Sequence, residues 1–278
     1  MIPITNSVSD GTGKKIQEDI NRHRNSLTAL LLMILAWAIY FPSTHFDFVY
    51  FDDVRILKNH PELYGHTSLD SDLNAIFVTC FPLEETLPLR DITWATDSQL
   101  FGFGNPVGYH LGNVLLHGVV VATLFAFLLG TTKRYGFALA TTIAYLILAV
   151  HVEPVVWIMG RKDILSTLFM LLSLCSQTRR LSSTNLTAQG GWYAATLIFF
   201  TAGLLSKINV LTFPIVLLLH AFFLPYLRGE RLAADSLVWK QVGLREALLF
   251  IPSMMISSAA YIWYHKTLAQ MGIFDRGY

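Results

Sequence analysis

The chain has 278 residues, of which 53% are hydrophobic and only 14% are charged, and its mean hydropathy is +0.48. Soluble domains are more polar than this, so the composition excludes an ordinary soluble protein and favours a protein that lies largely in a lipid bilayer. A net charge of +1 provides no basic field for nucleic acid, and we expect membrane lipid to be the general partner.

Apolar segments recur along the chain at lengths close to a membrane crossing. A helix needs roughly 20 mostly apolar residues to span about 30 Å of hydrocarbon. We therefore predict an all-α integral membrane protein with about seven transmembrane helices. The fourth segment is short, and its start can lie in a loop that folds back into the membrane. The segments are residues 26–44, 107–130, 136–152, 164–178, 191–207, 209–227 and 247–265.

The distribution of Lys and Arg between the segments predicts the orientation, because short loops rich in these residues remain on the cytoplasmic side. We assign residues 1–25 to a cytoplasmic N-terminal tail and residues 26–278 to one transmembrane module. The one large loop, at about 45–106, then lies on the extracytoplasmic side, and its composition predicts short helices on the membrane surface. The cytoplasmic cations are Lys14, Lys15, Arg22, Arg24, Lys133, Arg134, Arg179, Arg180, Arg228, Arg231, Lys240 and Arg245.

Two adjacent carboxylates, Asp52 and Asp53, follow the first predicted span. Ionising both is costly unless a cation or a hydrogen-bond donor lies near. A carboxylate at the outer membrane surface can accept a proton from a hydroxyl nucleophile or hold a divalent ion, so a metal stays open and no cofactor is certain. The structural alternative is a helix N-cap, where Asp is favoured.

Three cations occupy positions that the orientation rule disfavours, at the outer ends of predicted spans: Arg161, Lys162 and Lys207. A phosphate-bearing ligand would explain them, because guanidinium and ammonium groups bind phosphate oxygens strongly where water is depleted. The alternative is that they extend to the membrane surface or pair with Asp163 and Glu153.

Polar side chains inside the predicted spans indicate either contacts between helices or a cavity. His110, Asn113 and His117 are spaced to share one helix face, which should point toward protein and not toward lipid. His151 and Glu153 end the third predicted span, and an acidic residue at such a position is a candidate functional residue.

Taken together, these runs resemble the membrane half of the bacterial tetratricopeptide-repeat membrane proteins and of the transmembrane tetratricopeptide O-mannosyltransferases. The most specific are Tyr-His-Leu-x-Asn-x-Leu-Leu-His at 109–117 and Trp-Ile-x-x-Arg-Lys-Asp-x-Leu-Ser at 157–166. The chain departs from the family pattern at Asp91, where Pro is usual. The later spans and the repeats of that family have no counterpart here, so we expect the membrane module alone. Further matches lie at 51–59, 88–94, 105–108, 153–156 and 203–207.

The resemblance implies the module of the C-type membrane glycosyltransferases (GT-C), with about seven spans and a large first outer loop. Such an enzyme transfers a sugar, here mannose, from a polyprenyl- or dolichyl-phosphate donor to a hydroxyl of a protein or glycan acceptor, with inversion. By similarity, Asp52 or Asp53 would be the catalytic carboxylate, and Arg161, Lys162 and Lys207 would bind the donor phosphate. The pocket would be shaped by Arg90, His110, Asn113, His151 and Glu153.

Two other functions remain open on sequence grounds. One is a transporter or flippase for a lipid-linked substrate, against which no pair of broken helices recurs in corresponding halves. The other is a non-catalytic membrane scaffold. We expect an integral membrane location, in a bacterial inner membrane or, if the host is eukaryotic, in the endoplasmic reticulum, with the N-terminus cytoplasmic.

Overall fold

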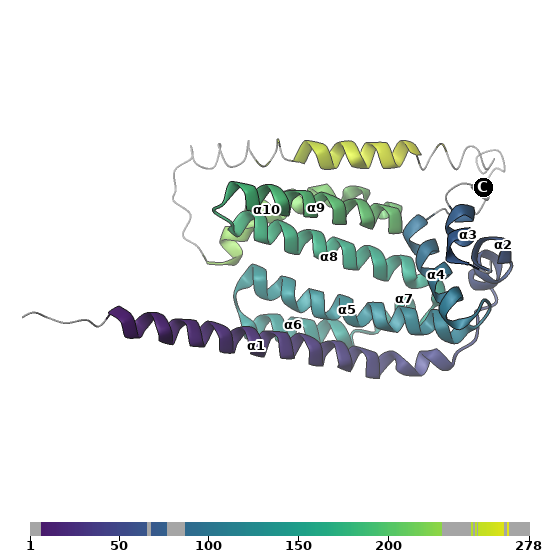
Figure 1. Cartoon of the computed structure of the whole chain (residues 1–278), viewed down its shortest axis with the longest axis horizontal. Coiled ribbons are helices and arrows are strands. Elements are labelled where there is room, and N and C mark those ends of the chain that lie inside the picture. Colours follow the sequence, from purple (N-terminus) through teal and green to yellow (C-terminus); the bar gives the residue numbers. More distant parts are fainter. Residues whose placement is uncertain are drawn as a thin grey trace, which may run out of the picture.

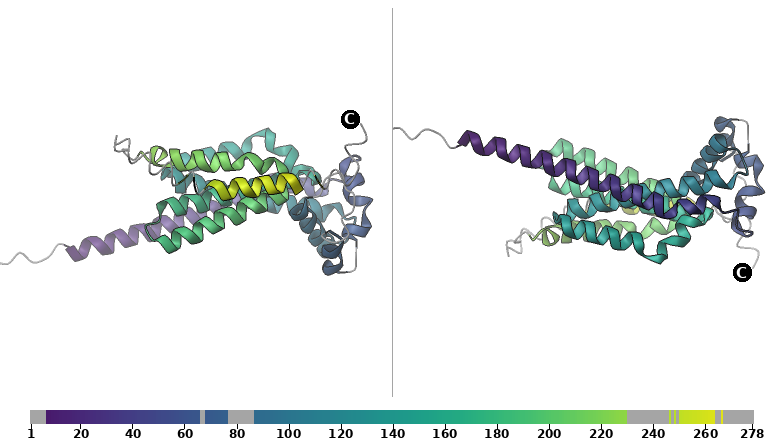
Figure 2. Two further views of the ribbon diagram at one scale, coloured as in Figure 1. Left: turned by 90° about the horizontal axis from the view of Figure 1, so that it is seen from above. Right: turned by 90° about the horizontal axis from the view of Figure 1, so that it is seen from below.

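The chain forms a bundle of long helices with a group of short helices at one end (Figures 1 and 2). The computed structural model describes residues 7–65, 68–76, 87–229, 246, 248, 250–263 and 266. All regular structure in this part is helical, which confirms the predicted all-α class there. The long helices are α1 (Ser7–Tyr40), α5 (Pro106–Thr132), α6 (Tyr135–Ile147), α8 (Arg161–Ser182), α9 (Leu186–Ser206) and α10 (Phe213–Leu227).

Within the described residues, three helical segments are long and apolar enough to cross a membrane: Lys15–His45, Pro106–Thr132 and Ile208–Leu227. They coincide with the first, second and sixth predicted spans, although α1 continues beyond the predicted boundary into the N-terminal tail. The chain is thus a membrane protein.

The third predicted span, 136–152, is not one straight helix. Helix α6 ends at Ile147, and α7 (Val152–Val156) follows at an angle of 61° after the short turn η4 (Ala149–His151). Leu148 between them has an extended backbone. Pro154 has no N–H to donate to the preceding turn, which favours a break here. The pair counts as a fourth span only if the bent helices cross together.

The remaining predicted spans correspond to α8, α9 and a helix at Phe250–Trp263. Helix α8 begins with three charged residues and ends near Arg179 and Arg180, so its apolar stretch is short. Helix α9 contains Gln189 and three glycines, which lower its apolar content, and the described part of the last helix, Phe250–Trp263, is shorter than a full crossing. These helices run along the bundle axis (Figure 1). The number of seven spans stays a prediction.

Helix α5 lies at the centre of the bundle, between α1, α6 and α8, while α8 packs along α9. Small and aliphatic side chains such as Ala36, Val121 and Ile164 fill the interior, and Phe125 is fully enclosed among them. Large aliphatic side chains on the outer faces, for example Ile198, stay exposed. That distribution is the one expected of helices whose outer surface meets lipid.

The predicted outer loop folds into short helices at one end of the bundle. They form a buried cluster in which Leu57, Tyr64 and Trp94 pack against Tyr109 of α5 and Met159. We call this group the cap. It is more compact than separate surface helices, because it shares a core with the bundle; residues 66–67 and 77–86 of the loop lie outside the described part. The cap comprises η1 (Phe41–His45), η2 (Asp53–Lys58), α2 (Pro61–Tyr64), α3 (Leu69–Asn74) and α4 (Pro88–Phe101).

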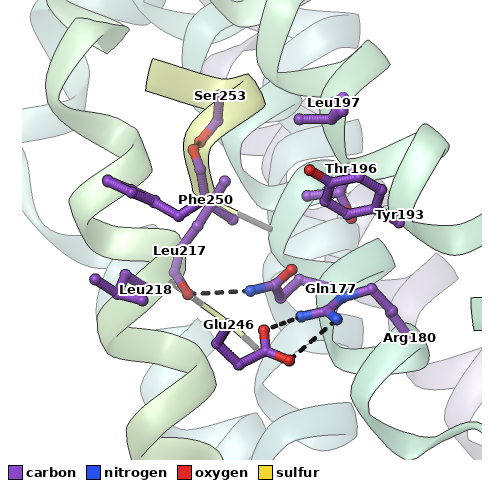
Figure 3. A pocket seen from close by; sticks show the side chains of 10 residues that line it. All are labelled: Gln177, Arg180, Tyr193, Thr196, Leu197, Leu217, Leu218, Glu246, Phe250 and Ser253. Carbon is purple, nitrogen blue, oxygen red and sulfur yellow. Dashed lines mark hydrogen bonds and ion pairs between the residues drawn. The ribbon is translucent and has the colours of Figure 1, made fainter. Parts of the chain in front are cut away.

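Cations that the sequence assigns to the cytoplasmic side meet at the opposite end of the bundle. The Arg228 guanidinium donates to the Gly130 carbonyl at 3.3 Å and to the Ser182 hydroxyl at 2.8 Å. The sequence predicts that Arg180 is a charge in a cytoplasmic loop, but its side chain is buried and ion-paired with Glu246 (Figure 3). Burial of a charge requires such a partner.

Candidate functional site

Asp53 is enclosed where the cap meets the bundle. Its Oδ2 accepts a hydrogen bond from the Val49 N–H at 2.9 Å, and its side chain is fully buried. The Met159 backbone and the Trp157 indole approach the carboxyl, although Oδ1 has no partner of good geometry among the described residues. Burial raises the pKa of Asp53, and these donors partly oppose the rise, while the neighbouring Asp52 adds to it.

Asp52 is the more accessible member of the pair. It occupies the N-cap position of η2, as the alternative of a helix cap predicts, but its side chain makes no capping hydrogen bond. Its Oδ1 lies 3.4 Å from Arg55 Nη2, and its side chain is 21% exposed. A substrate hydroxyl can therefore reach Asp52 without a rearrangement, whereas Asp53 would first have to be uncovered.

Arg161 begins α8, and its side chain contacts residues of α4 and α5. Its Nε donates to Asn113 Oδ1 at 2.7 Å and its Nη2 to the Tyr109 carbonyl at 2.6 Å, while Nη1 forms an ion pair with Asp97 of α4. The guanidinium is 1% exposed. Asn113 in turn donates to the Trp157 carbonyl at 2.9 Å, so the network joins α4, α5 and the turn before α8.

Asp97 is the residue of this network that no sequence motif indicates. Burial raises its pKa, and the Arg161 guanidinium opposes that rise. A single Asp in an amphipathic stretch belongs to no motif. The sequence feature that is connected with it is Gly112, in the 109–117 run. A Cβ at Gly112 would lie 2.6 Å from Asp97 Oδ2, which means that the glycine in the 109–117 run makes room for the ion pair.

Lys207, at the end of α9, forms an ion pair with Asp163 of α8. This contact is the pairing that the sequence analysis weighed against phosphate binding. Both side chains remain partly exposed, Lys207 by 24% and Asp163 by 39%. Lys162, between Arg161 and Asp163, is partly exposed as well and has a partner of its own. The three predicted cations thus differ, since only Arg161 is completely enclosed.

A cavity of about 150 Å³ lies beside this ion pair, among α5, α6, α7 and α8. His117, His151 and Asp163 line it, and the Tyr145 ring lies against His151, tilted by 36° with 3.9 Å between the centroids. Its volume corresponds to roughly five water molecules at about 30 Å³ each. Of the three polar residues that share one face of α5, His117 faces this cavity, whereas His110 and Asn113 are buried against protein elsewhere.

Arg90 lies apart from these groups, in α4 of the cap. Its Nε donates to Asp91 Oδ1 at 2.9 Å, and its guanidinium carbon lies 4.5 Å from the centre of the Trp94 ring. The side chain is fully buried. Burial raises the pKa of Asp91, while Arg90 opposes the rise. The departure from the family pattern at Asp91 therefore supplies a counter-ion to Arg90.

The two remaining pocket residues occupy different surroundings. His110 is buried close to Phe46, at 6.5 Å between ring centroids; the backbones of Asp47 and Val156 approach its ring, although neither ring nitrogen has a partner of good hydrogen-bond geometry among the described residues. Glu153, in the first turn of α7, is exposed. No group of three or more His, Cys, Asp or Glu residues in the described part is arranged to hold a metal ion. The divalent-ion alternative for the acidic pair stays open.

Chain segments that are far apart in sequence thus converge at the capped end. Asp53 lies against Trp157 and Met159, which precede Arg161 by a few residues, and α8 carries Asp163 toward Lys207. The carboxylate pair and the predicted cations therefore lie at the same end of the bundle and not at opposite ends.

Comparison with known proteins finds animal relatives. The chain is 31% identical over 145 residues to mouse Protein O-mannosyl-transferase TMTC4, a match that covers 46% of the chain and 19% of the relative. It is 28% identical over 176 residues to human Protein O-mannosyl-transferase TMTC2, covering 60% of the chain and 20% of the relative. Drosophila melanogaster Protein O-mannosyl-transferase Tmtc2 is 26% identical over 201 residues, with 69% and 21% covered.

These matches concern a small part of each relative. The chain spans about one fifth of the length of the curated relatives that it matches. No family model matches the sequence, and no solved structure matches the fold.

Proposed function

We propose that the chain is the membrane module of a GT-C-type glycosyltransferase. It would transfer a sugar, mannose in the first instance, from a polyprenyl- or dolichyl-phosphate donor to a hydroxyl of a protein or glycan. The observation that carries the proposal is the convergence of Asp52 and Asp53 with the Lys207–Asp163 pair at one end of a membrane bundle. Similarity to proteins named O-mannosyl-transferases supports the choice of chemistry and of sugar.

In this proposal Asp52 is the catalytic base, because its carboxylate is accessible. The acceptor oxygen attacks the anomeric carbon and gives its proton to Asp52 as the new bond forms. The bond from the anomeric carbon to the phosphate oxygen breaks on the opposite face, and its electrons leave with the lipid phosphate, so the configuration inverts. Asp53, which is fully buried, positions η2 and does not touch the acceptor.

Lys162 and Lys207 are the cations that we assign to the donor phosphate. Both lie at the start of α8 or beside it and remain partly exposed. The donor phosphate would replace Asp163 as the ion-pair partner of Lys207. The ammonium groups of Lys162 and Lys207 would then stabilise the negative charge on the leaving group. Arg161 enters as a positioning residue, because its donors are already occupied by Asp97, Asn113 and Tyr109.

The cavity lined by His117, His151 and Asp163 is the place where the proposal seats the sugar. It has room for one ring and lies beside the cation that would hold the phosphate. The surroundings of the cavity are completed by Arg90, His110, Asn113 and Glu153. Of these, Arg90 stabilises the cap and Asn113 holds the turn before α8.

The proposal is tested by transfer of radiolabelled mannose from polyprenyl-phosphate mannose to a Ser/Thr-rich peptide, with the chain in liposomes. We expect Asp52→Asn to lower the rate by roughly 10²- to 10⁴-fold, the usual contribution of a general base. Asp70→Asn serves as the control, because Asp70 is an exposed carboxylate of the same cap. Normal transfer by Asp52→Asn would refute the assignment of Asp52 as the base, and normal transfer by Asp53→Asn as well would remove the whole carboxylate pair from the mechanism.

The rival functions give different results in the same liposomes. Movement of intact donor across the membrane without transfer would indicate a transporter, and neither activity would indicate a scaffold. The proposal places the reaction on the extracytoplasmic side, in a bacterial inner membrane or the endoplasmic reticulum. The animal sources of the relatives favour the second location.

A further inference from the structure

A groove of about 500 Å³ lies between α1 and α5 at the end of the bundle away from the cap. Sites for small molecules commonly measure roughly 300–1,000 Å³. Asn21 and Arg24 of α1 line one side, and Phe125, Leu129 and Lys133 line the other. We call it the α1–α5 groove. Its residues take no part in the proposed transfer.

The cationic mouth of the groove is held in place by neighbouring contacts. The Arg24 guanidinium carbon lies 4.3 Å from the centre of the Tyr135 ring, and the Tyr135 hydroxyl lies 2.9 Å from Thr28 Oγ1. Lys133 follows α5 with a left-handed backbone, at φ 58°, which fixes the direction in which the chain leaves the helix. Arg24 and Lys133 are therefore presented from two helices that are joined through Tyr135.

The groove lacks a negative charge to balance these cations. None of its eleven described lining residues is acidic. Arg228 adds a third cation nearby, since it donates to the carbonyl of Gly130, which also lines the groove. Burial and the charge of Arg228 lower the pKa of Lys133, as expected of an ammonium group that has no anion beside it.

The opposite part of the groove is apolar. Phe125, Ala126 and Leu129 form its floor on α5, and Ala29 continues it on α1. Leu30 and Leu31, which follow Ala29 in α1, are exposed. A soluble anion would use the cations alone, whereas a molecule with a phosphate and a hydrocarbon chain would use both parts.

We propose that the α1–α5 groove binds an anionic phospholipid. The headgroup phosphate would lie between Arg24 and Lys133, which donate to its oxygens, and an acyl chain would follow Phe125, Ala126 and Leu129. Basic pockets between transmembrane helices recognise anionic headgroups in this way. The site is separate from the proposed donor site, because the two lie at opposite ends of the bundle (Figure 1).

The test compares retention of phosphatidylglycerol and phosphatidylcholine on the purified 278-residue chain by native mass spectrometry. We expect selective retention of phosphatidylglycerol, and the double variant Arg24→Gln/Lys133→Gln should weaken it roughly 25-fold, about fivefold for each cation. The matched control is Arg22→Gln/Arg134→Gln, which removes the same charge from exposed neighbours that do not line the groove.

Equal loss in both double variants would mean general attraction to a basic surface and would overturn the site. Ala126→Trp provides a second variant that keeps both cations and fills the apolar floor, and it should also release the lipid. Retention by both groove variants would refute the proposal, as would equal thermal protection by inorganic phosphate and phosphatidylglycerol. Asp52→Asn should leave retention unchanged, so failure of this inference is distinguishable from failure of the proposed transfer.

Discussion

At the scale of single residues, Arg161 shows how burial changes the meaning of a charge. Its position at the outer end of a predicted span is typical of a phosphate-binding cation, yet its side chain is 1% exposed and each of its three nitrogens donates to a protein acceptor. A buried guanidinium requires an anion, and Asp97 is that anion. The ion pair thus holds α4 against the start of α8.

Removal of one partner leaves the other as an uncompensated buried charge. We expect Asp97→Asn to lower the free energy of unfolding by about 3–5 kcal/mol. Thermal unfolding of the detergent-solubilised protein measures the change. Asp70→Asn, at an exposed site, should shift stability by no more than about 0.5 kcal/mol. Adding Arg161→Gln to Asp97→Asn should recover part of the loss, and a stable single variant would contradict the positioning role of Arg161.

At the scale of helices, the contact between α1 and α5 depends on one glycine. Trp37 of α1 lies over Gly118, and its indole N–H donates to the Leu115 carbonyl at 3.2 Å. A Cβ at Gly118 would lie 2.6 Å from the Trp37 Cδ1 atom, closer than packing permits. Small residues commonly allow such approaches between membrane helices.

Gly118→Ala therefore forces α1 and α5 apart. We expect a loss of about 1–3 kcal/mol, the usual cost of overpacking. Gly136→Ala is the matched control, because a Cβ at Gly136 of α6 meets no atom within 4 Å, and it should be neutral or slightly stabilising. Adding Trp37→Ala to Gly118→Ala should relieve the clash, and equal Tm values for Gly118→Ala and Gly136→Ala would exclude it.

The helices that the sequence predicts best are those with uninterrupted apolar runs. The predicted spans 26–44, 107–130 and 209–227 lie within Lys15–His45, Pro106–Thr132 and Ile208–Leu227, because the length and the apolar composition of these segments specify a crossing. The cap could not be predicted in the same detail, since the edge contact of Tyr64 with Trp94 joins residues that no periodicity relates. For the same reason the motifs predict candidate site residues but do not indicate Asp97, whose importance comes only from a partner 64 positions away.

At the scale of the whole molecule, the bundle has two chemically different ends. The capped end contains the carboxylate pair, and the other end gathers cations such as Arg228 and Lys133. Positive residues in short loops favour the cytoplasmic side. We therefore expect the capped end to face away from the cytoplasm.

Cysteine labelling in whole cells tests this orientation. The background lacks Cys80 and Cys175. Tyr50→Cys in the cap should react with a membrane-impermeant maleimide in intact cells, or in sealed vesicles whose extracytoplasmic face is outside, because Tyr50 is 92% exposed. Arg134→Cys, at the opposite end, should react only after permeabilisation. The reverse pattern would invert the topology and would place the acidic pair in the cytoplasm.

The break between α6 and α7 has a mechanical consequence for the surrounding bilayer. Ile147, Leu148 and Val150 at the break are 73%, 54% and 70% exposed, so they form an aliphatic rim where a straight helix would have continued. Hydrocarbon must bend inward to cover that rim, and each ångström of hydrophobic mismatch costs a fraction of a kcal/mol. Shorter lipid tails lower that elastic cost, and we therefore expect the protein to be more stable in a thin membrane than in a thick one.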